Sequence, residues 1–285
     1  MRSTVVSAFL NTANKAKRDV VRLFSLTFVT GGLLFASLAA NASTLISSTE
    51  YIDYEFPDSV QEQCYEKNNC PQIKVKYLKT NQDWLNDIVN KRVNNIAINS
   101  KMSESPVSNA TDDKAAKLAI DDFAQSQMID LPDEVQWSYS LIVTPEYLGH
   151  VKLGQGEDLE LFEISSYVFT GGAHGMPSRE YLVFDPASKQ QITLEDMLKP
   201  NQQARFNALA YDAYQSWVQS MDEDVKSYEQ SWPFTLSHNI TLTDKGVDIR
   251  YQPYAIGPYA YGMPVLTIAY DNLTGILKPR FLPSI

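Results

Sequence analysis

A glycine-rich segment with one histidine is the first part of this chain in which chemistry would be sought. Residues 167–177 read Tyr-Val-Phe-Thr-Gly-Gly-Ala-His-Gly-Met-Pro, and His174 is one of three histidines in the chain. Histidine can act as a general base, a metal ligand or a hydrogen-bonding anchor. Glycine allows left-handed backbone and close approach of neighbouring groups. The segment therefore raises three hypotheses: a structural turn, a binding surface or a catalytic loop.

The residues that accompany His174 favour a structural turn first, a binding surface second and catalysis last. A zinc site would need companion ligands at a spacing such as His-x-x-x-His, which the sequence lacks. A general base would need a nucleophile nearby, and residues such as Ser165, Ser166 and Asp185 occur in any chain of this size. We predict no catalytic residue, no metal and no cofactor. The candidate binding residues in this segment are Thr170, Gly171, Gly172 and His174.

A second candidate surface is the tyrosine-rich segment Tyr-Gln-Pro-Tyr-Ala-Ile-Gly-Pro-Tyr-Ala-Tyr-Gly over residues 251–262. Tyrosine offers a large, rigid contact area with a polar tip, which suits protein interfaces and sugar platforms. The alternative is that the tyrosines pack beneath the loop. The candidate binding residues here are Tyr254, Tyr259 and Tyr261.

The two cysteines, Cys64 and Cys70, lie six positions apart. In an oxidising compartment such a pair is expected to form a disulfide. The alternative, a metal site, would need two further ligands, and no histidine is near. We predict a Cys64–Cys70 disulfide that pins a loop before the strand at Gln72–Leu78.

The first 42 residues have the order of a secretory signal: five basic residues, an apolar run, and Ala40-Asn41-Ala42 as a small-x-small cleavage site. The competing interpretation is an uncleaved membrane anchor, because the apolar run of about 18 residues is borderline for spanning a bilayer. We predict cleavage after Ala42 and a periplasmic or secreted protein with no stable membrane insertion.

The net charge of the chain is −10, and it becomes −14 when the leader, with five basic residues and one acidic residue, is removed. An acidic surface disfavours nucleic acid and attracts a basic partner. It also promotes solubility, which needs no partner.

The remaining pattern predicts an α+β fold, with a mostly antiparallel sheet packed against about three long helices. Helices are expected over about residues 82–98, with Asn81 as a cap, over 112–128, and over 202–221. Strands are expected over residues 51–57, 72–78, 135–154, 158–169, 179–185, 234–243, 246–252 and 264–270.

Residues 167–177, the segment Phe-Asp-Pro-Ala-Ser-Lys-Gln-Gln-Ile-Thr-Leu-Glu-Asp-Met-Leu and residues 246–273 together resemble the RsiV-like extracytoplasmic family (domain of unknown function 3298). The familiar pattern there is Tyr-x-x-Thr-Gly-Gly-Ala-His-Gly followed by a tyrosine-rich loop. The resemblance implies a PdaC-type N-terminal module over residues 43–164 and an RsiV-like module over residues 165–285, which together form one compact unit. The best understood family member binds lysozyme with its outer part.

Two functions follow as expectations. The first is a non-catalytic extracytoplasmic binding protein whose partner is a basic wall enzyme such as lysozyme, or peptidoglycan. The second is a cell-wall hydrolase centred on the Gly-Gly-Ala-His-Gly loop.

Overall fold

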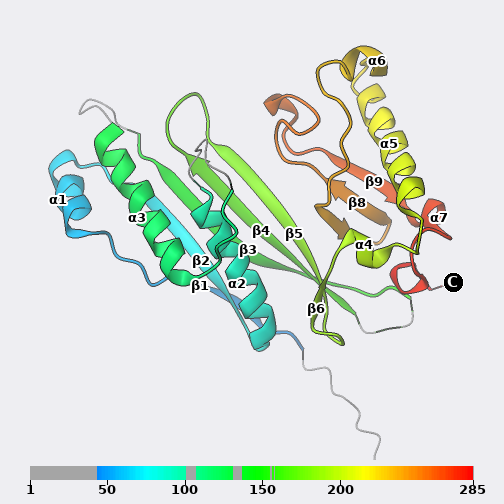
Figure 1. Cartoon of the computed structure of the whole chain (residues 1–285), viewed down its shortest axis with the longest axis horizontal. Coiled ribbons are helices and arrows are strands. Elements are labelled where there is room, and N and C mark those ends of the chain that lie inside the picture. The colour runs from blue at the N-terminus through cyan, green and yellow to red at the C-terminus, as the bar shows by residue number, and fades with distance from the viewer. Residues whose placement is uncertain (1–43, 101–106, 131–136, 155, 157, 285) are drawn as a thin grey trace, which may run out of the picture. The chain divides into compact units, whose positions relative to one another are not determined.

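The computed structural model describes residues 44–100, 107–130, 137–154, 156 and 158–284, so the predicted signal peptide lies outside the described residues. A six-stranded sheet is the larger of the two sheets described in the unit that spans Leu45–Ile285 (Figure 1). Its strands follow chain order across the sheet, and every neighbouring pair is antiparallel except β2 and β3. The strands are β1 (Ser47–Tyr51), β2 (Gln72–Thr80), β3 (Ser140–Val151), β4 (Leu159–Phe169), β5 (Met176–Asp185) and β6 (Gln190–Ile192).

Helices α2 (Asp83–Ile98) and α3 (Asp113–Asp130) pack on this sheet and on each other (Figure 1). Apolar residues recur along both helices at a spacing of three or four, which places them on one face. This face meets β2 to β5 in a first core whose members include Leu85, Val89, Phe123, Phe162 and Phe184. No helix within the described part of the chain is both long and apolar enough to span a bilayer.

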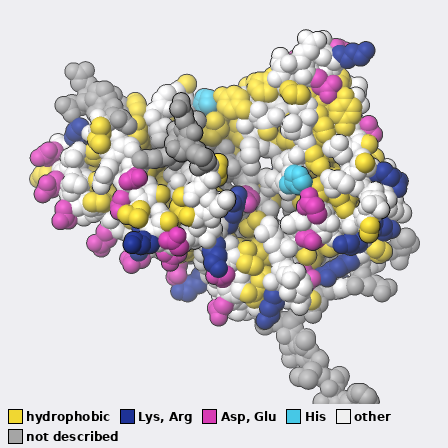
Figure 2. All heavy atoms as spheres, in the orientation of Figure 1, with side chains coloured by type: hydrophobic (Ala, Val, Ile, Leu, Met, Phe, Trp, Pro, Cys, Tyr) yellow, Lys and Arg dark blue, Asp and Glu magenta, His cyan; other side chains and the backbone are white. Residues whose placement is uncertain are grey.

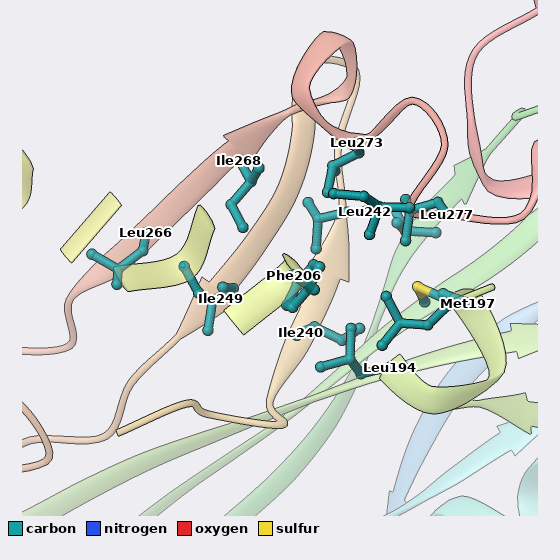
Figure 3. Close-up of a cluster of buried hydrophobic side chains, with 14 of the residues drawn as sticks. Leu194, Met197, Phe206, Ile240, Leu242, Ile249, Leu266, Ile268, Leu273 and Leu277 are labelled. Atoms are coloured by element: carbon teal, nitrogen blue, oxygen red, sulfur yellow. The ribbon is translucent and has the colours of Figure 1, made fainter. Parts of the chain in front are cut away.

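A second, three-stranded antiparallel sheet is built from β7 (Ile240–Leu242), β8 (Gly246–Arg250) and β9 (Val265–Ala269). Helix α5 (Gln203–Gln219) packs against β9. The second core that results contains Phe206, Leu242, Ile249 and Leu266, all of which Figure 3 labels (Figure 3). The short elements around it are α4 (Leu194–Met197), α6 (Val225–Tyr228), η1 (Tyr259–Tyr261), α7 (Tyr270–Leu273) and η2 (Pro279–Phe281).

Strand β5 contributes to both cores because its side chains alternate between the two faces of the sheet. Leu182 and Phe184 belong to the first core, whereas Val183 belongs to the second. Strand β4 does the same with Phe162 and Leu159. The two cores are therefore separated by one layer of sheet.

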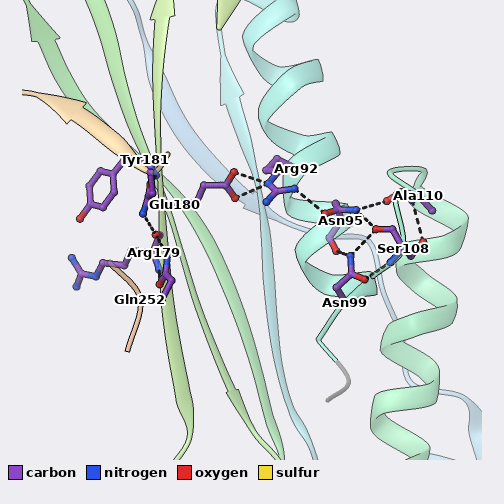
Figure 4. Close-up of polar contacts among 10 residues, drawn as sticks. Arg92, Asn95, Asn99, Ser108, Ala110, Arg179, Glu180, Tyr181 and Gln252 are labelled. Atoms are coloured by element: carbon purple, nitrogen blue, oxygen red, sulfur yellow. Dashed lines mark hydrogen bonds and ion pairs between the residues drawn. The ribbon is translucent and has the colours of Figure 1, made fainter. Parts of the chain in front are cut away.

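Two amide side chains join the start of β5 to the second sheet. Strand β6 pairs only with Val183–Asp185 of β5. Earlier in β5, the Asn239 side chain accepts from the backbone N–H of Tyr181 (2.8 Å) and donates to the carbonyl of Arg179 (2.8 Å). Gln252 accepts from the N–H of Arg179 (3.0 Å) and donates to the same carbonyl (2.6 Å) (Figure 4). These amides satisfy backbone groups that a neighbouring strand would otherwise pair.

The disulfide between Cys64 and Cys70 is present, with 4.9 Å between the two Cα atoms. Its setting differs from the loop that the sequence predicts, because Cys64 lies within α1 (Asp58–Lys67). The bond closes the turn at the end of this helix, where Asn68 adopts left-handed backbone (φ 47°). Helix α1 buries only Val60 and Cys64, so its apolar pattern is too sparse to predict it.

The α+β class with a mostly antiparallel sheet and long helices α2, α3 and α5 is confirmed. Three local predictions are wrong. Residues 51–57 do not form a strand: β1 ends at Tyr51, after which Tyr54 and Phe56 pack edge to face before α1. Asn81 does not cap α2, whose N-cap is Gln82; the Asn81 side chain instead accepts from the N–H of Ile46 (3.1 Å). The strand expected over 234–243 is reduced to β7, because Ile240–Leu242 is the part that pairs with β8.

Candidate functional site

The glycine-rich turn and the tyrosine-rich loop, which are about 80 residues apart in the chain, meet in space. The ring of His174 stacks on that of Tyr259, with 3.8 Å between centroids and 17° between planes. Tyr254 completes the group at 6.4 Å from His174 and 5.6 Å from Tyr259. We call these three side chains the aromatic platform. The platform joins the β4–β5 turn to the loop that precedes β9.

Hydrogen bonds fix the orientation of each ring in the platform. His174 Nδ1 lies 3.0 Å from the Gly175 carbonyl oxygen, and Tyr259 donates to the same oxygen at 3.1 Å. The hydroxyl of Tyr254 lies 3.2 Å from His174 Nε2. A neutral imidazole with its proton on Nδ1 satisfies both contacts, because Nδ1–H then donates and Nε2 accepts. Both ring nitrogens of His174 are thus used inside the platform.

The glycines of the turn are required by the rings that pack against them. A Cβ atom on Gly171 would lie 2.5 Å from Cη2 of Trp137, and Gly171 also has φ 98°. A Cβ atom on Gly175 would lie 2.3 Å from Cζ of Tyr167. Two aromatic residues therefore support the turn from outside it. Trp137 was not among the predicted site residues, and Tyr167, which begins the glycine-rich motif and lies in β4, was given no role.

Tyr254 has the least favourable backbone of the platform residues. Its φ is 68°, in the left-handed region that bulky residues rarely occupy, and its side chain is 44% exposed. Such a conformation costs on the order of 1–3 kcal/mol and is common at binding sites. A strained, exposed aromatic ring is therefore a candidate contact residue.

The other candidate residues do not all join this group. Tyr261 packs edge-on against Trp217 (6.1 Å, 89°) and is 41% exposed, so it presents a separate surface. Thr170 and Gly172 are exposed at the turn. Tyr251 is buried, which raises its pKa to about 12, and it donates to the Thr235 carbonyl (2.9 Å). The tyrosine-rich loop thus combines both expectations, with Tyr251 beneath it and Tyr254 on its surface.

Exposed apolar side chains form a band along the upper rim of the face in Figure 2, over the β4–β5 turn and the loop before β9 in Figure 1 (Figure 2). Acidic side chains gather mainly away from this band on the same face. Apolar contact and long-range charge attraction would therefore come from different parts of this surface.

Two of the residues considered for catalysis, Ser165 and Asp185, have other partners. Ser165 donates to the Thr144 carbonyl (3.3 Å), and Asp185 pairs with Arg280 (2.7 Å). Among the described residues, no three His, Cys, Asp or Glu side chains are grouped so that they could hold a metal ion. The platform itself consists of stacked rings and a backbone carbonyl, an arrangement suited to contact.

Comparison with known proteins finds a family match for part of the chain. Residues 195–271 match the family described as "Protein of unknown function (DUF3298)". This DUF3298 segment runs from α4 to α7 and includes Tyr254 and Tyr259, whereas His174 lies outside it. None of the curated proteins compared with the chain matches it.

Two solved structures resemble almost the whole described fold. A DUF3298 family protein from Pseudomonas aeruginosa PAO1 is 26% identical, with a TM-score of 0.57 over 85% of this chain and 96% of that chain. A member of the same family from Bacteroides fragilis NCTC 9343 is 17% identical, with a TM-score of 0.54 over 83% of this chain and 94% of that chain. The second likeness shows the fold alone. The likeness of residues 43–164 to a PdaC-type module stays a prediction.

Proposed function

We propose that this chain is a non-catalytic binding protein of the cell envelope, and that the aromatic platform contacts its ligand. The observation that carries the proposal is the exposed ring of Tyr254, held in left-handed backbone and fixed by His174. A rigid aromatic side chain loses little conformational entropy when it is buried by a partner, which is why such residues anchor interfaces.

The envelope location rests on two independent features. The leader has the order of an export signal. The Cys64–Cys70 disulfide is typical of proteins that reach an oxidising compartment. A periplasmic or secreted protein would meet both wall enzymes and peptidoglycan.

We propose a basic wall enzyme such as lysozyme as the first ligand to test. The negative net charge of the exported chain would accelerate its encounter with a cationic protein. Apolar contact at the platform would then control how long the complex lasts. The resemblance of the glycine-rich and tyrosine-rich segments to a family whose best understood member binds lysozyme supports the same choice.

Surface plasmon resonance with immobilised lysozyme tests this proposal. Tyr254→Ala should raise the dissociation rate about tenfold or more, since interface anchors commonly contribute 2 kcal/mol or more. The matched control is Tyr65→Ala, because Tyr65 lies on α1, is 90% exposed and is not one of the three platform residues. Raising the salt concentration should lower the association rate of the wild type and of both variants, because exposed charges are screened within about 10 Å at 0.1 M salt.

If lysozyme does not bind, or if Tyr254→Ala dissociates from it no faster than Tyr65→Ala does, the platform does not recognise lysozyme. Peptidoglycan is the second candidate, favoured by the exposed ring faces, which could stack on sugars. Sedimentation with purified sacculi would show it, with Tyr254→Ala lost from the pellet and Tyr65→Ala retained.

The competing function is a wall hydrolase centred on the Gly-Gly-Ala-His-Gly loop. Release of soluble fragments from sacculi, abolished in a folded His174→Ala variant, would establish the hydrolase and contradict our proposal.

A further inference from the structure

A pocket of about 300 Å³ opens between the start of β5 and the second sheet. Two of its lining residues, Pro177 and Tyr251, are close in sequence to His174 and Tyr254 of the platform. Its polar wall is formed by Arg179, Tyr181 and Arg250. Its apolar wall includes Pro177, Met263 and Val265. Pockets of this size accept small molecules or the end of a peptide.

The alternation of β5 directs two of these polar side chains to one face. Arg179 and Tyr181 point to the same side of the strand, whereas Glu180 points to the other side and pairs with Arg92 of α2 (Figure 4). The same odd-numbered face of β5 includes Val183 of the second core. The pocket thus lies on this face of β5, where Arg179 and Tyr181 take the place of apolar core residues.

The two guanidinium groups keep donors in reserve. Arg250 lies over the ring of Tyr181 (4.3 Å), donates to its hydroxyl (3.4 Å) and donates to Asp248 (3.0 Å). Arg179 donates to Glu163 through Nη1 at 3.3 Å. Each guanidinium has five N–H groups, which is more than these partners use.

Arg179 is the most exposed of the four charged side chains at the pocket, two of which are carboxylates. The side chains of Glu163 and Asp248 are 8% and 11% exposed, while that of Arg179 is 54% exposed. A ligand would therefore meet the guanidinium of Arg179 first. The carboxylates lie behind the arginines, where they orient the two guanidinium groups.

The backbone of Arg179 is already held by hydrogen bonds in the absence of a ligand. Gln252 bonds to both its N–H and its carbonyl, and Asn239 bonds to the same carbonyl. A site whose backbone is already fixed has less conformational entropy to lose on binding.

We propose that this pocket binds the free carboxylate of a peptide C-terminus or an amino acid. Planar guanidinium groups match the two oxygens of a carboxylate and bind them as a fork. The apolar wall of Pro177, Met263 and Val265 then receives a small apolar side chain next to the carboxylate. This inference does not rest on the proposed role of the platform, because it uses none of the platform side chains.

The test is a titration followed by two-dimensional NMR of the ¹⁵N-labelled protein, with N-acetylalanine in its L and D forms. N-acetylalaninamide has the same shape without the charge, so it should bind at least about tenfold more weakly. Tighter binding of N-acetylalanine than of free alanine assigns the site to a peptide C-terminus, and the reverse order assigns it to an amino acid.

Arg179→Gln should weaken the binding of N-acetylalanine at least about tenfold, and Arg179→Lys, which keeps the charge but loses the fork, should weaken it less. Arg92→Gln is the matched control, since Arg92 of α2 pairs with Glu180 on the opposite face of β5. The affinity of this variant for N-acetylalanine should equal that of the wild type. Arg179 is chosen for substitution because its side chain is 54% exposed, whereas that of Arg250 is 25% exposed, so that its replacement disturbs the fold less.

Equal affinity for N-acetylalanine and its amide would overturn the proposal. So would unchanged affinity in Arg179→Gln, or no saturable binding of any of these compounds at tens of millimolar.

Discussion

Replacement of Phe206 by alanine should reveal whether the two cores unfold together. Phe206 is fully buried on α5 and contacts the second core, which Figure 3 shows around it (Figure 3). Removing a buried phenylalanine ring costs about 3–5 kcal/mol, through lost transfer free energy and the cavity left behind. This is a large part of the roughly 5–15 kcal/mol of a typical domain.

The loss should extend to the first core, because β4 and β5 are shared. Val183 and Leu159 face the second core from the same strands that carry Phe184 and Phe162 into the first. If the second core opens, one face of these strands becomes exposed to water. The slowest-exchanging amides of α2 and of α5 should therefore lose the same 3–5 kcal/mol of protection in Phe206→Ala.

Hydrogen exchange measured by mass spectrometry gives this protection for each helix separately. Leu118→Ala is the control, because Leu118 is 55% exposed and its truncation should change the protection of neither helix by more than about 0.5 kcal/mol. Phe206→Leu is the milder variant to use if the alanine variant does not fold. A loss confined to α5, with α2 unchanged, would refute the reasoning and show two independently unfolding modules.

Three further outcomes are expected. Replacing both Cys64 and Cys70 by serine should lower the free energy of unfolding by about 2 kcal/mol in urea, because the loop that the bond closes is short. Gly175→Ala should cost about 1–3 kcal/mol in thermal melts, since its methyl group would overlap the ring of Tyr167, and it should also weaken ligand binding at the platform. Asp185→Asn should cost about 1.5–3 kcal/mol near pH 7: although burial opposes ionisation, hydrogen bonds from Arg280 and Ser188 lower the pKa of Asp185. A lowered carboxyl pKa stabilises the fold above the unfolded pKa of about 3.9, so the difference between variant and wild type should shrink as the pH falls below about 4, and a constant difference down to pH 2 would contradict this cause.

The helices that the sequence predicts well are those whose apolar pattern is complete. Helices α2, α3 and α5 each bury a stripe of residues, and each appears close to its predicted bounds. Helix α1 fails because it buries only Val60 and Cys64. Strand β1 was missed for a similar reason: its residues are almost entirely exposed, and it is defined by its pairing with β2.

The site shows a sharper limit. Each half was visible in the sequence: the glycines predicted a turn, and the tyrosines predicted a surface. Their meeting was not, because nothing local to His174 specifies a partner about 80 residues away. The role of Trp137 was hidden for the same reason, because it packs against Gly171 from another segment of the chain. The two pocket arginines left one trace, a charged residue inside each of two strand-like segments, where an arginine needs a partner or a ligand.

The hydrogen bonds of the Asn239 and Gln252 side chains to β5 explain why the platform and the pocket can both exist at this junction. A side-chain amide can imitate a strand's hydrogen bonds, yet it occupies far less space than a strand. Asn239 and Gln252 therefore satisfy the backbone of Arg179 and Tyr181 while leaving room beside them for a pocket. The contacts of Gln252, which lies two residues before Tyr254, also tie the start of the tyrosine-rich loop to β5. A third strand at this place would have sealed the edge of β5 and closed the pocket, so the use of two amides in place of a strand is what keeps this surface available to a ligand.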